Sequence, residues 1–553
     1  MPILKNMDEN RRDRSKVWMP LLFSLVLIVG MIFGFDLRDT LRNKRDIQAV
    51  IERNDRLEEI IDLIHDKYVD TVNNNGLYKE AINGILKNLD PHTVYIPADE
   101  VEEVKEDLEG GFFGIGVEFS IVRDTIQVIS VIEKGPAEQA GVVVGDQLIK
   151  VGDTVVAGKK ISSEGIIHML RGKQHSSVSV TLKDPVKGTE KQVPIVRDEV
   201  PIYSVDASLK IDSVTGFIRI NRFSATTYNE FSKALKELKA QGIKQLIVDL
   251  RENPGGYLDA ATMIADEFLD DNKLIVYTKG IHAPKTEYKA GEKGMFETGK
   301  IAILVDESSA SASEILSGAI QDWDRGVIVG RRTFGKGLVQ EQFELSDGAA
   351  LRLTIAKYYT PSGRCIQRSF EKGKEAYEKD YEDRLTDGEL TGKDTVTRAD
   401  TTVYYTSKHR AVYGGGGISP DVYVPYDTVR LSSALLGMVF SDELKTVLWD
   451  HFIHERTNLN YKTIAEYNEQ FKDEEKITKS YFAVLKPDER KAAQKILSKP
   501  ESLNYFNLQI KAQIARFLFR ENGYYAVYTK DDKVVQKALQ VMNGDTYSKL
   551  INR

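Results

Sequence analysis

The sequence predicts a multidomain α/β protein, in which a layered core of strands and helices is combined with a small β-rich unit and flanking helical regions. Strands and helices alternate between residues 200 and 425, and short alternating strands fill residues 110–197. Helical periodicity dominates before residue 107 and after residue 425. The 553 residues are enough for three or four folding units of about 150 residues each.

Composition excludes several classes of protein. Hydrophobic residues make up 41% of the chain and charged residues 29%, which is too polar for a multi-spanning membrane protein and too apolar for a disordered one. The formal net charge of −7 gives no basic field that would attract nucleic acid. Cys365 is the single cysteine, and the eight histidines lack HExxH spacing, so we expect no disulfide, metal or other cofactor.

The first element is an apolar segment, residues 17–35, interrupted only by Ser24. At about 1.5 Å per residue it spans roughly 28 Å, close to the hydrocarbon thickness of a bilayer. Basic residues within residues 1–16 predict that this end stays in the cytoplasm and that the rest is exported. No A-x-A-like cleavage site follows. We therefore expect a single-pass anchor in the inner (cytoplasmic) membrane, with the bulk of the chain on the periplasmic side; a buried core helix is the alternative.

Residues 38–107 are predicted to form an N-terminal helical region. Apolar residues repeat there at three- and four-residue steps, and Pro91 interrupts the pattern in Leu89-Asp90-Pro91-His92-Thr93. A compact β unit follows over residues 108–197. Its expected strands are 117–122, 125–131, 147–151 and 177–182, with a helix at 163–171.

The layered βα core is assigned to residues 198–425. Its expected strands are 216–220, 245–250, 301–305 and 327–329, and its expected helices are 225–240, 258–269 and 312–323. Within it, the polar and charged stretch at about 370–408 is predicted to be a surface insertion. Residues 426–553 are predicted to form a C-terminal helical domain.

Two glycine-containing motifs characterise the β unit. One is Gly114-Ile115-Gly116-Val117, and the other extends from Pro136 to Gly152 and includes Gly145-Asp146-Gln147-Leu148-Ile149. Together they resemble the PDZ domains that accompany proteases. The resemblance implies that the glycine loop holds the C-terminal carboxylate of a peptide, while the adjacent strand edge accepts the peptide as an added strand. The alternative is another small β domain with a Gly-x-Gly turn.

A serine-rich turn joins the strand 301–305 to the helix 312–323. It reads Asp306-Glu307-Ser308-Ser309-Ala310-Ser311-Ala312. A serine at such a turn lies where backbone N–H groups and the positive end of a helix can stabilise an oxyanion. Ser, Thr and Asp at this position can also be nothing more than a helix N-cap, so the turn alone does not establish a site.

Lys336 follows Ser311 by 25 residues, in the string Thr333-Phe334-Gly335-Lys336-Gly337-Leu338-Val339-Gln340. The pair resembles the carboxyl-terminal processing peptidases (tail-specific proteases), in which a lysine activates a serine nucleophile. Three more strings agree in the same order: Asp249-Leu250-Arg251-Glu252-Asn253-Pro254-Gly255-Gly256, Tyr358-Tyr359-Thr360-Pro361-Ser362-Gly363-Arg364 and Gly416-Gly417-Ile418-Ser419-Pro420-Asp421. The resemblance covers roughly residues 40–425 and implies a ClpP/crotonase-like layered core with an inserted PDZ domain.

By this resemblance, Ser311 is the nucleophile, Lys336 the general base and Gln340 the orienting partner of the base. An exposed lysine has a pKa near 10.4, and lowering it by about three units costs roughly 4 kcal/mol, which requires burial or a nearby cation. If residues 336–340 are extended, their even offset places both side chains on one face.

The resemblance also implies an oxyanion hole built from the Ala312 N–H and either Gly255 or Gly256. The choice between the two glycines stays open. Asp322 matches an aspartate implicated in the family, and a solvated helix acid is the alternative. The string from Gly330 to Gly337 is almost a P-loop, but Gly337 replaces the hydroxyl that binds magnesium and a strand, not a helix, is expected to follow.

The expected function is that of a membrane-anchored, extracytoplasmic serine endopeptidase that binds free C-terminal tails and cleaves through an acyl-enzyme. Its expected partners are polypeptides and the membrane, not nucleic acid; a homo-oligomer contact or an adaptor is left open for the terminal helical regions. One alternative is an inactive peptide-binding scaffold of the same fold. Another is a crotonase-like enzyme acting on a thioester, which the exported location and the PDZ motifs disfavour.

Overall fold

The structure is a computed structural model that describes residues 56–551, apart from residue 292, residues 393–401 and residue 431. The predicted basic segment 1–16 and anchor 17–35 lie outside the described residues. Within the described part, no helix combines the length and the apolar character needed to cross a bilayer. The chain divides into two compact units, one ending at Asn88 and the other beginning at Leu89.

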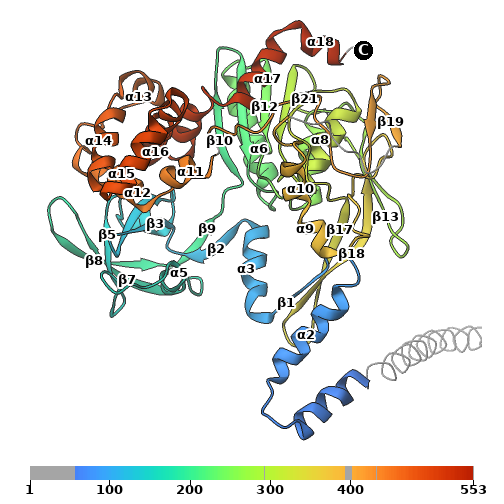
Figure 1. The fold of residues 1–553 in the computed structure, drawn as a ribbon, viewed down its shortest axis with the longest axis horizontal. Helices are drawn as coiled ribbons and strands as arrows, with labels where there is room; N and C mark the ends of the chain where they lie inside the picture. Colours follow the sequence, from blue (N-terminus) through green and yellow to red (C-terminus); the bar gives the residue numbers. More distant parts are fainter. Residues whose placement is uncertain (1–55, 292, 393–401, 431, 552–553) are drawn as a thin grey trace, which may run out of the picture. The chain divides into compact units, whose positions relative to one another are not determined.

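The unit that ends at Asn88 is helical in its described part. Residues 56–67 form a helix, and α2 follows at Asn74–Leu86 (Figure 1). Asn73 begins α2, because its side-chain oxygen accepts a hydrogen bond from the Gly76 N–H at 3.3 Å. The apolar periodicity of the sequence predicts these helices.

The unit that begins at Leu89 opens with a strand that the sequence analysis did not predict. β1 (Val94–Ile96) pairs antiparallel with β18 (Ala350–Tyr359), with Val94 opposite Arg352. The three residues of β1 are β-branched or aromatic, and Pro91 interrupts the helical pattern just before them. Helix returns only with α3 (Ala98–Glu109).

The predicted β unit folds around its own apolar core. Its sheet has the order β3-β4-β5-β7-β8, with β6 paired to β5. β2 (Gly111–Gly114) pairs antiparallel with β9 (Asp198–Pro201), so the chain enters and leaves the unit side by side. The remaining elements are β3 (Val117–Val122), β4 (Thr125–Val131), α4 (Pro136–Gln139), β5 (Gln147–Val151), β6 (Thr154–Val155), α5 (Ser163–Leu170), β7 (Ser177–Lys183) and β8 (Glu190–Val196).

The centre of the layered core is a six-stranded sheet of order β10-β11-β12-β15-β16-β21. Neighbouring strands from β11 to β21 are parallel, and β10 adds antiparallel at one edge. The strands are β10 (Val205–Lys210), β11 (Thr215–Ile220), β12 (Gln245–Asp249), β15 (Lys300–Val305), β16 (Val327–Gly330) and β21 (Val422–Tyr423).

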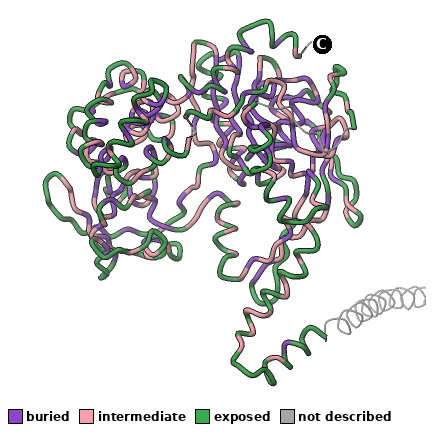
Figure 2. The backbone as a smooth tube through the Cα atoms, in the orientation of Figure 1, coloured by how far each residue is buried: buried purple, intermediate pink, exposed green. Residues whose placement is uncertain are grey.

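Helices cover both faces of this sheet. Successive strand residues point to opposite sides, so each strand contributes side chains to both of the cores beneath these helices. Val248 and Ile303 belong to one buried core, whereas Ile247 and Leu304 belong to the other. The buried backbone is concentrated in this region (Figure 2). The covering helices are α6 (Thr227–Ala240), α7 (Leu258–Asp266) and α8 (Ala312–Asp322) on the first face, and α17 (Lys533–Asn543) and α18 (Asp545–Ile551) on the second.

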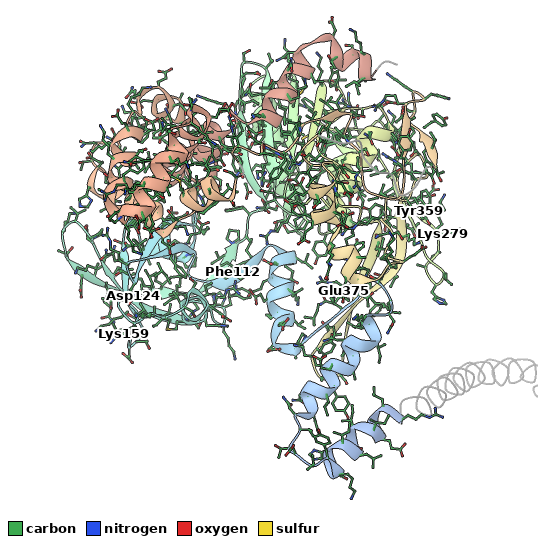
Figure 3. All side chains as sticks on the ribbon, in the orientation of Figure 1. Phe112, Asp124, Lys159, Lys279, Tyr359 and Glu375 are labelled. Carbon is green, nitrogen blue, oxygen red and sulfur yellow. The ribbon has the colours of Figure 1, made fainter. Side chains whose placement is uncertain are left out.

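A second sheet has the order β1-β18-β13-β14, and β17 also pairs with β18. Its other strands are β13 (Leu274–Lys279), β14 (Thr286–Lys289) and β17 (Leu338–Glu344). The rings of Tyr277 and Tyr359 stack across β13 and β18 with centroids 4.8 Å apart; Tyr359 is labelled in Figure 3. β17 confirms the strand predicted after Lys336, which excludes the helix that a P-loop would need there.

The insertion at 370–408 is anchored to the core by buried side chains, unlike the solvated segment that its charged composition suggests. It contains α9 (Lys374–Glu378) and α10 (Asp380–Thr386), and β19 (Val403–Tyr405) pairs with β20 (Ala411–Tyr413). Tyr377, Arg384 and Leu390 are buried. Glu389 accepts hydrogen bonds from Arg332 at 2.8 Å and from Arg384 at 3.1 Å, so both buried cations have a carboxylate partner.

The C-terminal residues form helices throughout, as predicted. α16 is kinked at Phe519 and Arg520, whose backbone dihedrals are not helical. Helices α11 to α16 share one apolar core, which Val122 of β3 joins. They are α11 (Ser433–Val439), α12 (Asp442–His454), α13 (Ile464–Gln470), α14 (Glu474–Val484), α15 (Pro487–Leu497) and α16 (Pro500–Tyr528). The multidomain α/β architecture expected from the sequence is confirmed.

Candidate active site

Ser311 occupies the turn between β15 and α8, as the sequence predicts. It is the N-cap residue of α8 and is partly buried. Its backbone has φ 53° and ψ −112°, a conformation that a residue with a side chain adopts only under strain. Such strain is typical of nucleophilic serines placed at the end of a strand.

The buried carboxylate of Glu314 ties the serine turn to the lysine loop. Its Oε2 accepts hydrogen bonds from the Ser311 N–H at 2.8 Å and from the Lys336 N–H at 2.9 Å. Its Oε1 accepts from the Gly335 N–H at 2.8 Å and the Thr333 hydroxyl at 2.5 Å. Burial raises the pKa of Glu314 to about 7, although all these donors favour its ionised form.

Tyr358 makes a second connection between the same two segments. Its hydroxyl lies 3.1 Å from the Ser311 carbonyl oxygen and 2.5 Å from the Lys336 carbonyl oxygen. The side chain is fully buried, and burial raises its pKa well above the ordinary value, so the hydroxyl remains a donor. Glu314 and Tyr358 together hold the backbones of residues 311 and 336 in a fixed relation.

The structure brings Lys336 and Gln340 together. Lys336 Nζ donates to Gln340 Oε1 at 2.9 Å, and Gln340 Nε2 donates to the carbonyl oxygen of His92. The second bond fixes the amide so that its oxygen faces the amine. The predicted contact is therefore present, but Lys336 precedes β17 and a register shift separates Val339 from Gln340, so the simple strand alternation that we invoked does not produce it.

The environment of Lys336 favours its neutral form. Burial lowers the pKa of the amine below 10.5, and the Arg352 guanidinium lowers it further, whereas Asp90 and Glu314 act in the opposite direction. His92 does not add a charge at neutral pH, because burial and Lys336 lower its pKa to about 4. The amine thus lies in the kind of setting that a lysine base requires.

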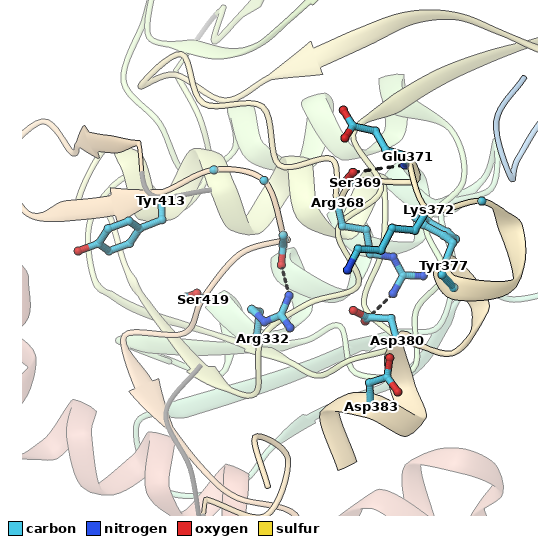
Figure 4. A pocket seen from close by; sticks show the side chains of 16 residues that line it. Arg332, Arg368, Ser369, Glu371, Lys372, Tyr377, Asp380, Asp383, Tyr413 and Ser419 are labelled. Carbon is cyan, nitrogen blue, oxygen red and sulfur yellow. Dashed lines mark hydrogen bonds and ion pairs between the residues drawn. The ribbon is translucent and has the colours of Figure 1, made fainter. Parts of the chain in front are cut away.

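An arginine and two aromatic rings, one of them from the insertion, lie beside the lysine loop. Arg368 lies over the rings of Phe334 and Tyr377, 4.0 and 3.8 Å from their centroids. The Tyr377 hydroxyl is 2.9 Å from His92 Nε2. A hollow of about 330 Å³ adjoins this cluster between the insertion and the loop 413–417 (Figure 4). Its Arg332 and Arg368 already pair with Glu389 and Asp380, so it is largely neutralised.

Of the predicted oxyanion residues, Gly255 lies against Ser311 and Ala312 follows Ser311 in the chain, and the structure distinguishes the two glycines. A side chain at Gly255 would lie 2.7 Å from Ser311 Cβ, which explains the need for glycine there. The Gly255 N–H is donated to Asn253 Oδ1 at 2.9 Å. Among the described residues, by contrast, the N–H groups of Gly256 and Ala312 have no hydrogen-bond acceptor.

A peptide-sized groove lies along β3 and α5 of the β unit. Its volume is about 410 Å³, and its walls include Phe112, labelled in Figure 3, and Phe119, Ile167 and Leu170. The carbonyl groups of Ile115 and Gly116 accept hydrogen bonds from Ala137 at 2.8 Å and Ile132 at 3.0 Å. Because the N–H of a trans peptide points opposite to its C=O, the N–H groups of Gly116 and Val117 face away from those partners.

Two residues near the site have roles that the sequence analysis did not assign. Glu314 was not predicted, although Ser followed three residues later by Glu before an apolar run is a recognisable N-terminal pattern of a helix. Asp322 was not assigned a role either, and the structure buries this carboxylate against Arg364 at 2.7 Å and the Ser362 N–H at 3.0 Å. Asp322 therefore stabilises the loop 362–364, and the solvated alternative is wrong.

Models of known families match three parts of the chain. "Peptidase family S41" matches residues 214–375, "PDZ domain" matches residues 127–184, and "Activating protease CtpB N-terminal domain" matches residues 36–100. The first contains Ser311, Lys336 and Gln340, and the second lies within the β unit. No family model among these reaches the C-terminal helices.

Sequence relatives agree with the family models. A "Carboxy-terminal-processing protease" of Bartonella bacilliformis is 33% identical over 319 residues, 56% of this chain and 72% of that one. "Carboxy-terminal processing protease CtpB" of Bacillus subtilis is 35% identical over 331 residues, 58% of this chain and 68% of that one. A "Probable CtpA-like serine protease" of Staphylococcus epidermidis is 35% identical over 316 residues, 56% of this chain and 62%, less than two-thirds, of that one. The chain belongs to the carboxy-terminal-processing proteases, serine-type peptidases of family S41 that here carry a PDZ domain.

Proposed function

We propose that this protein is an extracytoplasmic endopeptidase that hydrolyses peptide bonds with Ser311 as nucleophile and Lys336 as general base. One observation carries the proposal: a single buried oxygen, Glu314 Oε2, accepts the backbone N–H groups of both residues. The strained Ser311 backbone and the lowered pKa of the Lys336 amine support the same roles. The apolar segment 17–35 supports a membrane anchor that places this site outside the cytoplasm.

In the acylation step, the neutral Lys336 amine accepts the proton of the Ser311 hydroxyl while Oγ forms a bond to the carbonyl carbon of the substrate. The electron pair of the C=O bond moves to oxygen, and the N–H groups of Gly256 and Ala312 stabilise that negative charge. When the intermediate collapses, the Lys336 ammonium gives its proton to the leaving amine. Water then cleaves the acyl-enzyme in the reverse sequence, which restores Ser311 and neutral Lys336.

Gln340 keeps the base in position during this exchange. Its Oε1 accepts one N–H of Lys336 Nζ, whether the nitrogen is neutral or protonated, and its own amide is held by the His92 carbonyl. A neutral amide does not stabilise the ammonium as a carboxylate would. The amine is therefore oriented without a large rise in its pKa.

Activity is expected to rise with pH and to level off below pH 10.5. Only the neutral amine can accept the serine proton, and the pKa of Lys336 is lowered, so the neutral fraction grows with pH until the pKa is passed. The measurement is kcat/KM of a fluorogenic peptide from pH 5 to 11. A rate that keeps rising tenfold per pH unit until about 10.5 would contradict the assignment of this base.

The PDZ groove is proposed to bind the free C-terminus of the substrate. A charge-assisted hydrogen bond contributes roughly 1.5–3 kcal/mol, so amidation of the C-terminal carboxylate should raise KM about tenfold or more. The test compares two peptides that share a sequence with an apolar last residue and differ only in a free or an amidated C-terminus. A third peptide, amidated on an internal Glu side chain, controls for the loss of charge alone. Equal KM values for the first two would argue against tail recognition.

A further inference from the structure

The C-terminal region approaches the oxyanion loop through one buried ion pair. We propose that Asp532, in the turn before α17, is a positioning residue for this loop, acting through Arg251; the inference rests on the proposed function. α17 packs on the central sheet through Val535, Ala538 and Met542, and it lies beside β12 in Figure 1. The loop that supplies Gly256 begins directly after β12.

The carboxylate of Asp532 has two separate tasks. Its Oδ1 accepts the N–H groups of Val534 at 2.8 Å and Val535 at 3.2 Å, which begins α17. Its Oδ2 accepts a hydrogen bond from Arg251 Nη1 at 2.8 Å. Only 3% of the Asp532 side chain and 13% of the Arg251 side chain are exposed, so solvent screens this pair weakly.

Arg251 connects Asp532 to Asp249, the last residue of β12. Its Nε and Nη2 donate to the two oxygens of Asp249 at 2.8 and 2.6 Å, a bidentate pair with little freedom. Asp249 is fully buried and also contacts Arg219 at 3.3 Å. Burial alone would raise the pKa of Asp249, but Arg251 and Arg219 lower it, so the carboxylate is charged. The cluster therefore alternates in charge from Arg219 through Asp249 and Arg251 to Asp532.

The loop after Arg251 leads directly to the catalytic turn. The Asn253 carbonyl accepts hydrogen bonds from the Ala310 N–H and the Ser313 hydroxyl, both at 3.0 Å. Asn253 Oδ1 holds the Gly255 N–H, and Gly255 packs against Ser311. A shift of Arg251 therefore changes where the Gly256 N–H points. Without the charge of Asp532, one side of the buried Arg251 cation loses its partner, and the arginine must seek another.

The experiment replaces Asp532 by asparagine, which retains an oxygen for capping α17 but removes the charge that faces Arg251. Asp531→Asn is the matched control, because Asp531 is the adjacent residue, is half exposed and pairs with Arg430 instead of Arg251. The readouts are kcat and KM of full-length protein on an unfolded polypeptide, normalised to sites titrated with a fluorophosphonate that labels Ser311. Thermal unfolding is followed in parallel.

Asp532→Asn is expected to lower kcat per titrated site about 10- to 100-fold, with KM within twofold of wild type and the unfolding temperature close to that of Asp531→Asn. Asp532→Ser, which also keeps a capping oxygen, should show the same loss. A kcat per site equal to that of Asp531→Asn in both variants would overturn the inference, as would a loss explained entirely by fewer titratable sites. The proposed function itself would fail separately, if Ser311→Ala hydrolysed the substrate like wild type.

Discussion

Ser311→Ala is expected to lower kcat for peptide hydrolysis on the order of 10⁴- to 10⁶-fold. Alanine cannot form the acyl-enzyme, while Glu314, Tyr358 and the groove of the PDZ domain are unchanged. Substrate binding should therefore survive, with a Kd near the wild-type value. The measurement is the initial rate of cleavage of an unfolded polypeptide. Mass spectrometry of the wild-type protein should in addition detect the acyl group on the peptide that contains Ser311.

Ser308 provides the matched control for this substitution. It lies in the same turn, its side chain is exposed, and it has no part in the proposed chemistry. Ser308→Ala should keep a rate within about twofold of wild type, as surface substitutions usually do. Undiminished hydrolysis by Ser311→Ala would eliminate the serine mechanism. If neither wild type nor Ser311→Ala hydrolysed the substrate, the inactive scaffold would be favoured.

Lys336→Ala is expected to lower kcat about 10³-fold or more, because it removes the amine that is proposed to accept the serine proton. Lys336→Arg should be equally inactive: it retains the positive charge, but a guanidinium is not deprotonated in a protein and cannot serve as a base. The pair of variants thus separates a base from a structural cation. The rates are measured at pH 7 and at pH 9 to expose any residual dependence on pH.

Lys357→Ala is the control for the lysine series, since Lys357 is exposed on β18, the strand that pairs with β17 next to the lysine loop. Its rate should stay close to wild type. Substantial activity in Lys336→Arg would show that position 336 needs only a cation. In that case, another residue would have to take the serine proton.

Much of the core could be predicted from the sequence, because its signals are local. The expected strand 301–305 is β15 (Lys300–Val305), and the expected helix 312–323 is α8 (Ala312–Asp322). Continuous apolar runs and strand-to-helix alternation specify such buried parallel strands without knowledge of their partners. β1 was missed because three residues carry too little pattern, and its partner β18 lies more than 250 residues later.

The residues of the site could be predicted from motifs, but the contacts between them could not. Ser311, Lys336 and Gln340 could be named from motifs, and the structure places Lys336 Nζ 2.9 Å from Gln340 Oε1, while their catalytic roles remain proposals. The regular strand that was expected to align Lys336 and Gln340 is absent at residue 336. The carbonyl that orients Gln340 belongs to His92, 248 residues earlier, and backbone carbonyls leave no signature in a sequence.

The contacts of the C-terminal region with the central sheet could not be predicted from the sequence either. The amphipathic pattern of residues 533–543 predicts a helix but not the surface it covers. Only the fold shows that α17 packs on the sheet through Val535 and Ala538. The same limit applies to Asp532, which reads as an ordinary helix cap until its second oxygen is seen to contact Arg251.

The most direct test of the central claim is an NMR titration of the Lys336 amine itself. Full-length Ser311→Ala protein, labelled with ¹³C at lysine Cε, would be followed from pH 5 to 11, and the Lys336 resonance assigned by its absence in a variant that also carries Lys336→Arg. We expect a midpoint below 10.5, because the amine is buried and lies near Arg352. A midpoint of 10.5 for Lys336, with its resonance titrating in step with those of the exposed lysines, would contradict the proposed role of this amine as the base.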